Sequence, residues 1–230
     1  MVNQLKFKGI LIVISSPSGA GKTSLANSIV EENENISFST SVTTRPPRDG
    51  EKNGREYHFV EKDQFNLMIK NKRFIEDLLK IIVRFLKIHI NNQIESGATI
   101  IQIFDSWAGL LNEKDYDKYI FNPTKDLVNF VKSKKVPVIC FPKGINDYKN
   151  YVNLVKPDVI SIDYNVDPKK ISDSIDITIQ GGLNPNFLIG DKEQLKKNVK
   201  RYLDIFKDKP YILNLGHGVL PNTDPSMVDY

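Results

Sequence analysis

The chain has 230 residues, of which 40% are hydrophobic and 26% are charged, and its formal net charge is +4. This composition is that of a globular protein, and the length allows one large domain or two small ones. The mild positive charge comes mostly from lysines spread along the chain, which indicates solvated faces and not a nucleic-acid surface. The longest apolar run, residues 9–14, is too short to cross a bilayer. We therefore expect no nucleic-acid partner and no membrane.

Cys140 is the single cysteine, so the chain cannot form an internal disulfide. It lies in the apolar run 136–141, which favours a buried, inert thiol over a reactive one. The N-terminus lacks the basic, apolar and small-residue regions of a signal peptide. Together these features predict a reducing, cytoplasmic setting.

The first part of the chain begins as strand, turn and helix. Residues 8–14 form a short apolar run rich in β-branched residues, which predicts a buried strand. Residues 22–32 predict a helix with one apolar face. Further on, residues 57–60 are strand-like and residues 63–72 predict a short helix. The turn between the first strand and the first helix is rich in Ser, Pro and Gly.

This turn has the composition of a phosphate-binding loop. Its glycines let backbone N–H groups turn inward around an anion, and the helix that follows adds its positive end. Lys22 would place a point charge on the phosphates, and the Thr23 hydroxyl would be a ligand for Mg²⁺. The alternative is a glycine-rich strand-to-helix turn with an incidental lysine. The position of Gly-Ala-Gly-Lys-Thr between strand and helix favours the phosphate loop.

A second motif follows, with Ser41-Val42-Thr43-Thr44-Arg45-Pro46-Pro47-Arg48 leading to Gly50-Glu51, Gly54 and Tyr57-His58-Phe59-Val60. Two arginines three residues apart, with hydroxyls around them, suit a monophosphate. A solvated basic loop is the alternative. Glu76, which ends Phe74-Ile75-Glu76, would accept hydrogen bonds from a purine.

With the phosphate loop, this run resembles guanylate kinase over about residues 8–77. The resemblance implies ATP and Mg²⁺ as cofactors, with Thr23 contacting the metal of the bound nucleotide. The ATP-binding residues it implies are Ser16, Pro17, Ser18, Gly19, Ala20, Gly21, Lys22, Thr23 and Ser24. The GMP-binding residues it implies are Ser41, Arg45, Arg48, Tyr57 and Glu76.

The guanylate kinase pattern stops after Glu76. An arginine-bearing lid, the rest of the acceptor site and the rest of the parallel sheet should follow, and the sequence shows none of them. Phosphoryl transfer depends on positioning and on charge stabilisation. We therefore expect transfer by this segment to be very slow.

The second part of the chain alternates helices and strands. Residues 78–94 have helical apolar spacing, and Gly97 closes that helix. Alternation of this kind predicts a parallel sheet, as in part of a (β/α)8 barrel of about five βα units, whose active site lies at the C-terminal strand ends. The predicted strands are residues 99–104, 136–141, 158–163, 175–179 and 211–215, and the clearest helices are 123–134 and 192–206.

Polar or glycine-rich motifs follow three of these strands. They are Gln102-Ile103-Phe104-Asp105-Ser106-Trp107-Ala108-Gly109, Gln180-Gly181-Gly182-Leu183-Asn184-Pro185 and Asn214-Leu215-Gly216-His217-Gly218. They would bring a serine, an aspartate and a histidine to one mouth, as in a hydrolytic triad. However, the glycine elbow and oxyanion signatures of such enzymes are missing.

The motifs together resemble uroporphyrinogen decarboxylase over about residues 80–230. The runs 141–144 and 162–164 also fall at strand ends that this family uses. The resemblance implies that Ser106 and His217 contact substrate carboxylates. The alternatives are a strand-end cap for Ser106 and a histidine bonded within a glycine turn for His217.

The resemblance implies decarboxylation of the four acetate arms of uroporphyrinogen III to coproporphyrinogen, in haem biosynthesis, with no metal and no organic cofactor. It also implies a homodimer. A substrate with eight carboxylates needs several arginines, yet none lies between Arg84 and Arg201. In this family the arginines come from the N-terminal half of the barrel. We therefore expect both active sites of the chain to be incomplete.

These matches predict two modules, a guanylate-kinase-like fragment at 1–77 and a decarboxylase-like half barrel at 78–230. Three interpretations follow. The chain is a fusion of two truncated enzymes, produced by a deletion or a misjoined gene assembly. Alternatively, it is a binding protein that retains ATP and GMP sites on a barrel scaffold. As a third interpretation, it is an active decarboxylase that another chain completes.

Overall fold

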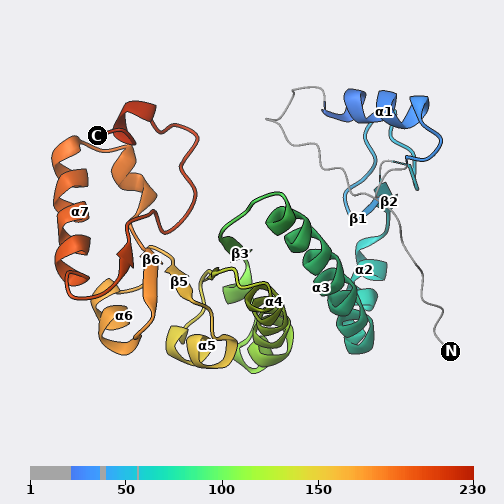
Figure 1. The fold of residues 1–230 in the computed structure, drawn as a ribbon. Helices are drawn as coiled ribbons and strands as arrows, with labels where there is room; N and C mark the ends of the chain where they lie inside the picture. Colours follow the sequence, from blue (N-terminus) through green and yellow to red (C-terminus); the bar gives the residue numbers. More distant parts are fainter. Residues whose placement is uncertain (1–21, 37–39, 56) are drawn as a thin grey trace. The chain divides into compact units, whose positions relative to one another are not determined.

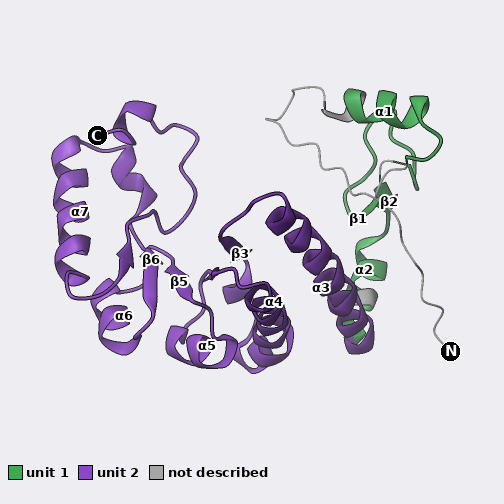
Figure 2. Ribbon diagram, viewed as in Figure 1, with its two compact units in different colours: residues 1–71 green, residues 72–230 purple. Residues whose placement is uncertain are grey.

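In the computed structural model, the described residues are 22–36, 40–55 and 57–230. The chain divides into two compact units, residues 1–71 and residues 72–230 (Figure 2). The division lies a few residues before the predicted module boundary at Asp77. The predicted strand 8–14 and the loop from Ser16 to Gly21 lie outside the described residues.

The first unit contains the helices α1 (Lys22–Glu32) and α2 (Lys62–Lys70) and the strands β1 (Ser41–Thr43) and β2 (Tyr57–Phe59). The two strands are parallel. The helix predicted at 22–32 and the strand predicted at 57–60 are confirmed. Strand β1 was not predicted, because three residues with exposed or half-buried side chains give no alternating pattern.

The second unit is a succession of βα units (Figure 1). Its five strands are parallel and are ordered as in the sequence, β3-β4-β5-β6-β7. This confirms the predicted partial (β/α)8 barrel. The strands are β3 (Ile101–Asp105), β4 (Val138–Pro142), β5 (Val159–Ile162), β6 (Thr178–Gly181) and β7 (Tyr211–Ile212). The helices are α3 (Lys72–Glu95), α4 (Asn122–Ser133), α5 (Tyr148–Val155), α6 (Pro168–Ser174) and α7 (Lys192–Ile205).

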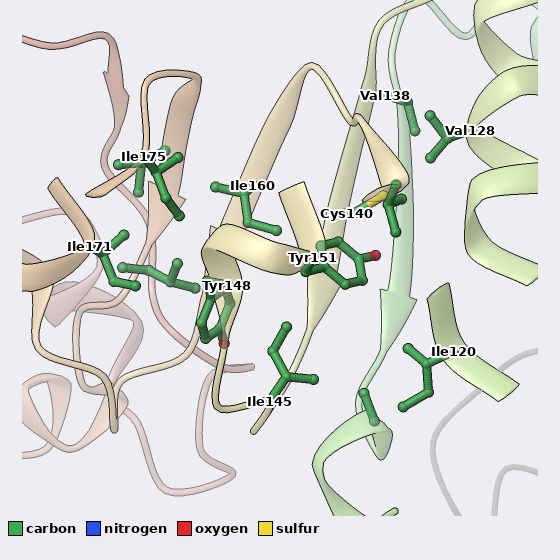
Figure 3. Close-up of a cluster of buried hydrophobic side chains, with 14 of the residues drawn as sticks. Ile120, Val128, Val138, Cys140, Ile145, Tyr148, Tyr151, Ile160, Ile171 and Ile175 are labelled. Carbon is green, nitrogen blue, oxygen red and sulfur yellow. The ribbon is translucent and has the colours of Figure 1, made fainter. Parts of the chain in front are cut away.

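The helices of this unit contact one another in chain order, from α3 to α7. The core lies between them and the sheet, and Figure 3 shows its central part, where Tyr151 lies near Cys140. Cys140 is fully buried, and burial raises the pKa of its thiol to about 12. The thiol is thus protonated and enclosed, as its apolar surroundings predicted. Among the described residues, no helix has the length and apolar character to span a membrane.

Helix α3 ends as its sequence predicts. Gly97 has φ +102°, and its N–H donates to the Ile94 carbonyl at 3.0 Å, while the Ala98 N–H donates to the Gln93 carbonyl at 2.9 Å. This pair of bonds is the Schellman motif, which requires a left-handed residue after the helix. Its start differs from the prediction, because the helix already begins at Lys72.

Candidate functional site

The loops after β3 and β4 are held together by two glycines. The Gly109 N–H donates to the Lys143 carbonyl at 2.9 Å, and the Lys143 N–H donates to the Asp105 carbonyl at 3.0 Å. A Cβ on Gly109 would lie 2.2 Å from the carbonyl oxygen of Gly144, so no larger residue fits there. The glycines at the ends of the motifs 102–109 and 141–144 are therefore explained by a close approach of two backbones.

Asp163 links the β4 loop to the end of β5. Its side chain is buried, and Oδ2 accepts the Gly144 N–H at 2.9 Å and the Tyr148 hydroxyl at 3.0 Å. Oδ1 accepts the Asn165 N–H at 2.8 Å. Burial, with the carboxylate close by as the next cause, raises the pKa of the Tyr148 hydroxyl. One carboxylate thus fixes two loops at the C-terminal strand ends.

The loops after β6 and β7 lie at the same end of the sheet and contact each other and the loop after β5. The Gly216 N–H donates to the Leu183 carbonyl at 2.7 Å, and a Cβ on Gly216 would lie 2.4 Å from the Tyr164 nitrogen. Gly182 has φ +90°, and its carbonyl accepts the Tyr202 hydroxyl at 2.6 Å. The motifs after all five strands therefore form one connected rim at the end of the sheet where barrel enzymes place their active sites.

A cavity of about 300 Å³ lies at this rim. Ser106, from the end of β3, and His217, from the loop after β7, both line it. These are the two predicted carboxylate contacts, so the structure brings them to one cavity from opposite edges of the sheet. The described lining contains neither lysine nor arginine, and it consists of Gln102, Phe104, Ser106, Phe141, Ser161, Asn214, Leu215, His217, Gly218 and Val219.

A polar layer adjoins this cavity, and we did not predict it from the sequence. The Gln180 Nε2 donates to the Ser161 Oγ at 3.3 Å and to the Gln102 Oε1 at 3.4 Å. Ser161 and Gln180 are buried, and Gln102 and Ser161 line the cavity. The available signal was a polar residue inside each of the strands β3, β5 and β6, because such a residue needs an interior partner.

The hydrolytic alternative receives no support from the geometry. In the described part of the chain, no hydrogen bond joins His217 to Ser106 or to a carboxylate. The backbone N–H groups of Trp107 and Ala108 donate to Asp105, and Asp163 is engaged by the loops. Burial raises the pKa of the Asp105 carboxyl in spite of these bonds. Both acids therefore act as loop braces.

The first unit gathers most of the predicted GMP contacts. Ser41 lies opposite Tyr57 in the register of β1 and β2. The Arg45 guanidinium lies over the Tyr57 ring, 5.0 Å from its centroid, and forms a bidentate ion pair with Glu51. The Arg48 N–H donates to the same carboxylate at 2.8 Å. Glu51 belongs to the motif, but its residue type and position did not predict it as a site residue.

Other predicted nucleotide contacts lie elsewhere. Glu76 is on α3 in the second unit, where it forms an ion pair with Lys118. Lys22, Thr23 and Ser24 open helix α1. The remaining predicted ATP residues, from Ser16 to Gly21, lie outside the described part of the chain. The ATP and Mg²⁺ assignments therefore stay predictions.

Comparison with known families decides the affiliation of the chain. The family model described as uroporphyrinogen decarboxylase (URO-D) matches residues 61–230. The chain belongs to the uroporphyrinogen decarboxylase family. A second model, described as guanylate kinase, matches residues 8–78, so that the two matches overlap over residues 61–78. Both predicted resemblances are confirmed.

Curated uroporphyrinogen decarboxylases agree with this affiliation. The protein of Rickettsia bellii is 39% identical over 165 residues, which are 70% of this chain and 48% of that protein. The protein of a Wolbachia from Drosophila simulans is 40% identical over 152 residues, which are 65% of this chain and 45% of that protein. The chain thus spans about half the length of the curated relatives it matches.

Proposed function

We propose that the second unit carries part of a uroporphyrinogen decarboxylase site, in which Ser106 and His217 contact one substrate carboxylate. The cavity that both residues line is the observation that carries this proposal. A serine hydroxyl and an imidazole N–H are hydrogen-bond donors that a carboxylate accepts. The polar layer at Gln102 and Ser161 supplies further uncharged partners.

We also propose that this unit does not decarboxylate uroporphyrinogen without a second polypeptide. The substrate carries eight carboxylates, and the described cavity lining offers no lysine or arginine for them. Electrostatic stabilisation of the developing charge is usually the largest contribution to catalysis. The groups that provide it would come from a chain that corresponds to the other half of the relatives.

An assay of carbon dioxide release from uroporphyrinogen tests both statements. The chain is assayed alone and together with the N-terminal half of the Rickettsia bellii protein, added as a separate polypeptide. We expect no turnover by the chain alone and measurable turnover by the mixture. Turnover by the chain alone would contradict the need for a partner, and an inactive mixture would contradict the complementation.

Measurements of ligand binding to variants test the predicted roles of Ser106 and His217 separately. Coproporphyrin binding, followed by fluorescence quenching in the same mixture, should weaken by about three- to tenfold in Ser106→Ala and in His217→Ala, the loss expected for one hydrogen bond. Ser96→Ala, an exposed change at the end of α3, is the matched control. Unchanged binding in both site variants would remove Ser106 and His217 from the site.

The contacts of Arg45 and Arg48 favour a second function, which is the binding of a purine nucleoside monophosphate by the first unit. Arg45 and the backbone N–H of Arg48 both contact the Glu51 carboxylate. The Arg45 guanidinium also lies over the Tyr57 ring, and Ser41 is opposite Tyr57 in the strand register. Calorimetric titration of the whole chain with GMP and with ATP·Mg tests this function. We expect heat on addition of GMP, and its absence at millimolar ligand would exclude the idea.

A further inference from the structure

The Glu51 carboxylate holds both arginines of the motif in the first unit. Arg45 Nη1 donates to Oε2 and Nη2 donates to Oε1, each at 2.7 Å. The Arg48 backbone N–H donates to Oε2 at 2.8 Å. Bidentate pairs of this kind fix the plane of a guanidinium as well as its distance. Glu51 therefore sets the orientation of Arg45 and the position of the Arg48 backbone together.

A turn brings Glu51 to this place. Its N–H donates to the Arg48 carbonyl at 3.0 Å, and Gly50, the third residue of the turn, has φ +86°. A turn with a positive φ at its third residue favours glycine there. Gly50 thus allows the turn, and the turn directs the Glu51 carboxylate at Arg45.

Two aromatic rings lie beside the guanidinium, and the Arg45 side chain remains 31% exposed. Its central carbon lies 5.0 Å from the centroid of Tyr57 and 5.6 Å from that of Phe59. A free arginine side chain has many rotamers, and a ligand that orders it loses affinity through that entropy. In the folded unit, the carboxylate and the two rings already contact this side chain before any ligand binds. A guanidinium carries five N–H donors. Besides the two bonds to Glu51, Nη1 donates to the Pro46 carbonyl at 2.9 Å. These three bonds do not exhaust the donors that a phosphate could accept.

We propose that Glu51 is a positioning residue for a phosphomonoester, holding Arg45 against Tyr57 before the ligand arrives. This inference rests on the nucleotide-binding function proposed above. The two arginines and Glu51 together leave one net positive charge for a phosphate dianion. If Glu51 instead occupied Arg45 as a competing anion, its removal would tighten phosphate binding, so the two roles predict opposite effects.

The test compares GMP with guanosine in calorimetric titrations of the whole chain. Glu51→Ala should weaken GMP binding by about tenfold or more, because the loss of a charge-assisted bidentate pair frees the arginine. Glu51→Gln, which keeps the shape and one acceptor, should lie between the wild type and Glu51→Ala. Guanosine affinity should change much less, since it has no phosphate. Glu31→Ala, an exposed change on α1, is the control for loss of one negative charge.

The outcomes separate this inference from the function on which it rests. Absence of GMP binding by the wild type overturns the nucleotide-binding function and the inference with it. Binding by the wild type that Glu51→Ala leaves unchanged or tightens overturns the inference alone. An equal loss of GMP and guanosine in both Glu51 variants also overturns it, because it shows a general structural role.

Discussion

At the scale of single residues, the rim of the second unit depends on Asp163. Asp163→Ala leaves the Gly144 N–H and the Tyr148 hydroxyl without their acceptor. Because buried donors without partners are costly, we expect the free energy of unfolding to fall by about 3 kcal/mol. Tyr148→Phe removes only one of these bonds and should cost about 1 kcal/mol. Urea denaturation measures both changes.

The control for this prediction is another aspartate of the same unit. Asp176 is fully exposed, and its ion pair with Lys209 is 3.7 Å long. Exposed pairs contribute little, so Asp176→Ala should change the free energy of unfolding by less than about 1 kcal/mol. Equal effects of Asp163→Ala and Asp176→Ala would show that Asp163 is not the brace of the rim.

Glu51 should give the first unit a distinctive response to acid. The hydrogen bond from Arg45 is the largest influence that lowers the pKa of Glu51, to about 2 from an ordinary value of 4.5. Because the folded pKa is the lower one, its contribution to stability is fully present above the unfolded pKa. It is lost as the pH falls from about 4.5 towards 2.

Carboxyl NMR of the whole chain measures this titration directly, and we expect a midpoint near 2 for Glu51. Thermal unfolding followed from pH 6 to pH 2 should show an acid-dependent loss of stability that is smaller in Glu51→Gln. A Glu51 midpoint at the ordinary value of 4.5 would mean that the ion pair with Arg45 does not form in solution.

The sequence predicted Ser106 and His217 as site residues because both follow strands within recognisable motifs, and both line the cavity at the rim. It did not locate Gln102 or Ser161, because their role depends on which strand face points inward. Gln102, Phe104 and Ser106 alternate along β3 and its end, and all three line the cavity. That alternation is visible in the sequence, but its direction is fixed only by the packing of the sheet.

At the scale of elements, α3 shows that apolar periodicity can predict a helix without predicting which of its side chains are buried. The helical apolar spacing of residues 78–94 includes Leu78, Ile82 and Leu86. In the structure these three are 39%, 42% and 38% exposed, while Val83 and Ile90 are buried. Apolar side chains cover a broad arc of α3 opposite its charged face, so spacing predicts the helix and its end at Gly97 but cannot select which part of that arc is buried.

Two glycines with positive φ allow the cost of backbone strain to be separated from that of packing. A Cβ on Gly97 would meet nothing within 4 Å, so Gly97→Ala should cost about 1 kcal/mol through φ alone. A Cβ on Gly182 would lie 2.9 Å from Tyr202 Cε1. Gly182→Ala should therefore cost about 2–4 kcal/mol, since overpacking adds to strain.

Urea denaturation of the two variants, with Gly218→Ala as a control, checks this order. Gly218 is an exposed glycine with no atom near its Cβ position and no positive φ. We expect the loss of stability to rise from Gly218→Ala to Gly97→Ala to Gly182→Ala. A smaller effect at Gly182 than at Gly97 would mean that the loop after β6 can move away from Tyr202.

At the scale of the whole molecule, the two matched families meet within continuous secondary structure. Asp77 lies inside α3, and the two family matches overlap over residues 61–78. The sequence motifs indicated a change of family after Glu76, because Glu76 is the last residue of the kinase pattern. The compact units instead divide between Asn71 and Lys72, where α2 has ended and α3 begins. The motif ends at the last residue expected to contact a ligand, whereas the boundary of a compact unit depends on how its elements pack.

Limited proteolysis should reveal this boundary. Proteases cut where the backbone can leave its structure locally, and junctions between compact units are such places. Lys70, Lys72 and Arg73 are exposed trypsin sites beside the junction. We expect trypsin to cut there first among the sites of residues 57–230 and to leave a resistant fragment that begins near Lys72, identified by mass spectrometry. Replacing the three residues with glutamine should slow that cut and no other. Early cuts at Lys80 or Lys87 would instead show that α3 unfolds locally more readily than the junction. The stable second unit would then begin after α3.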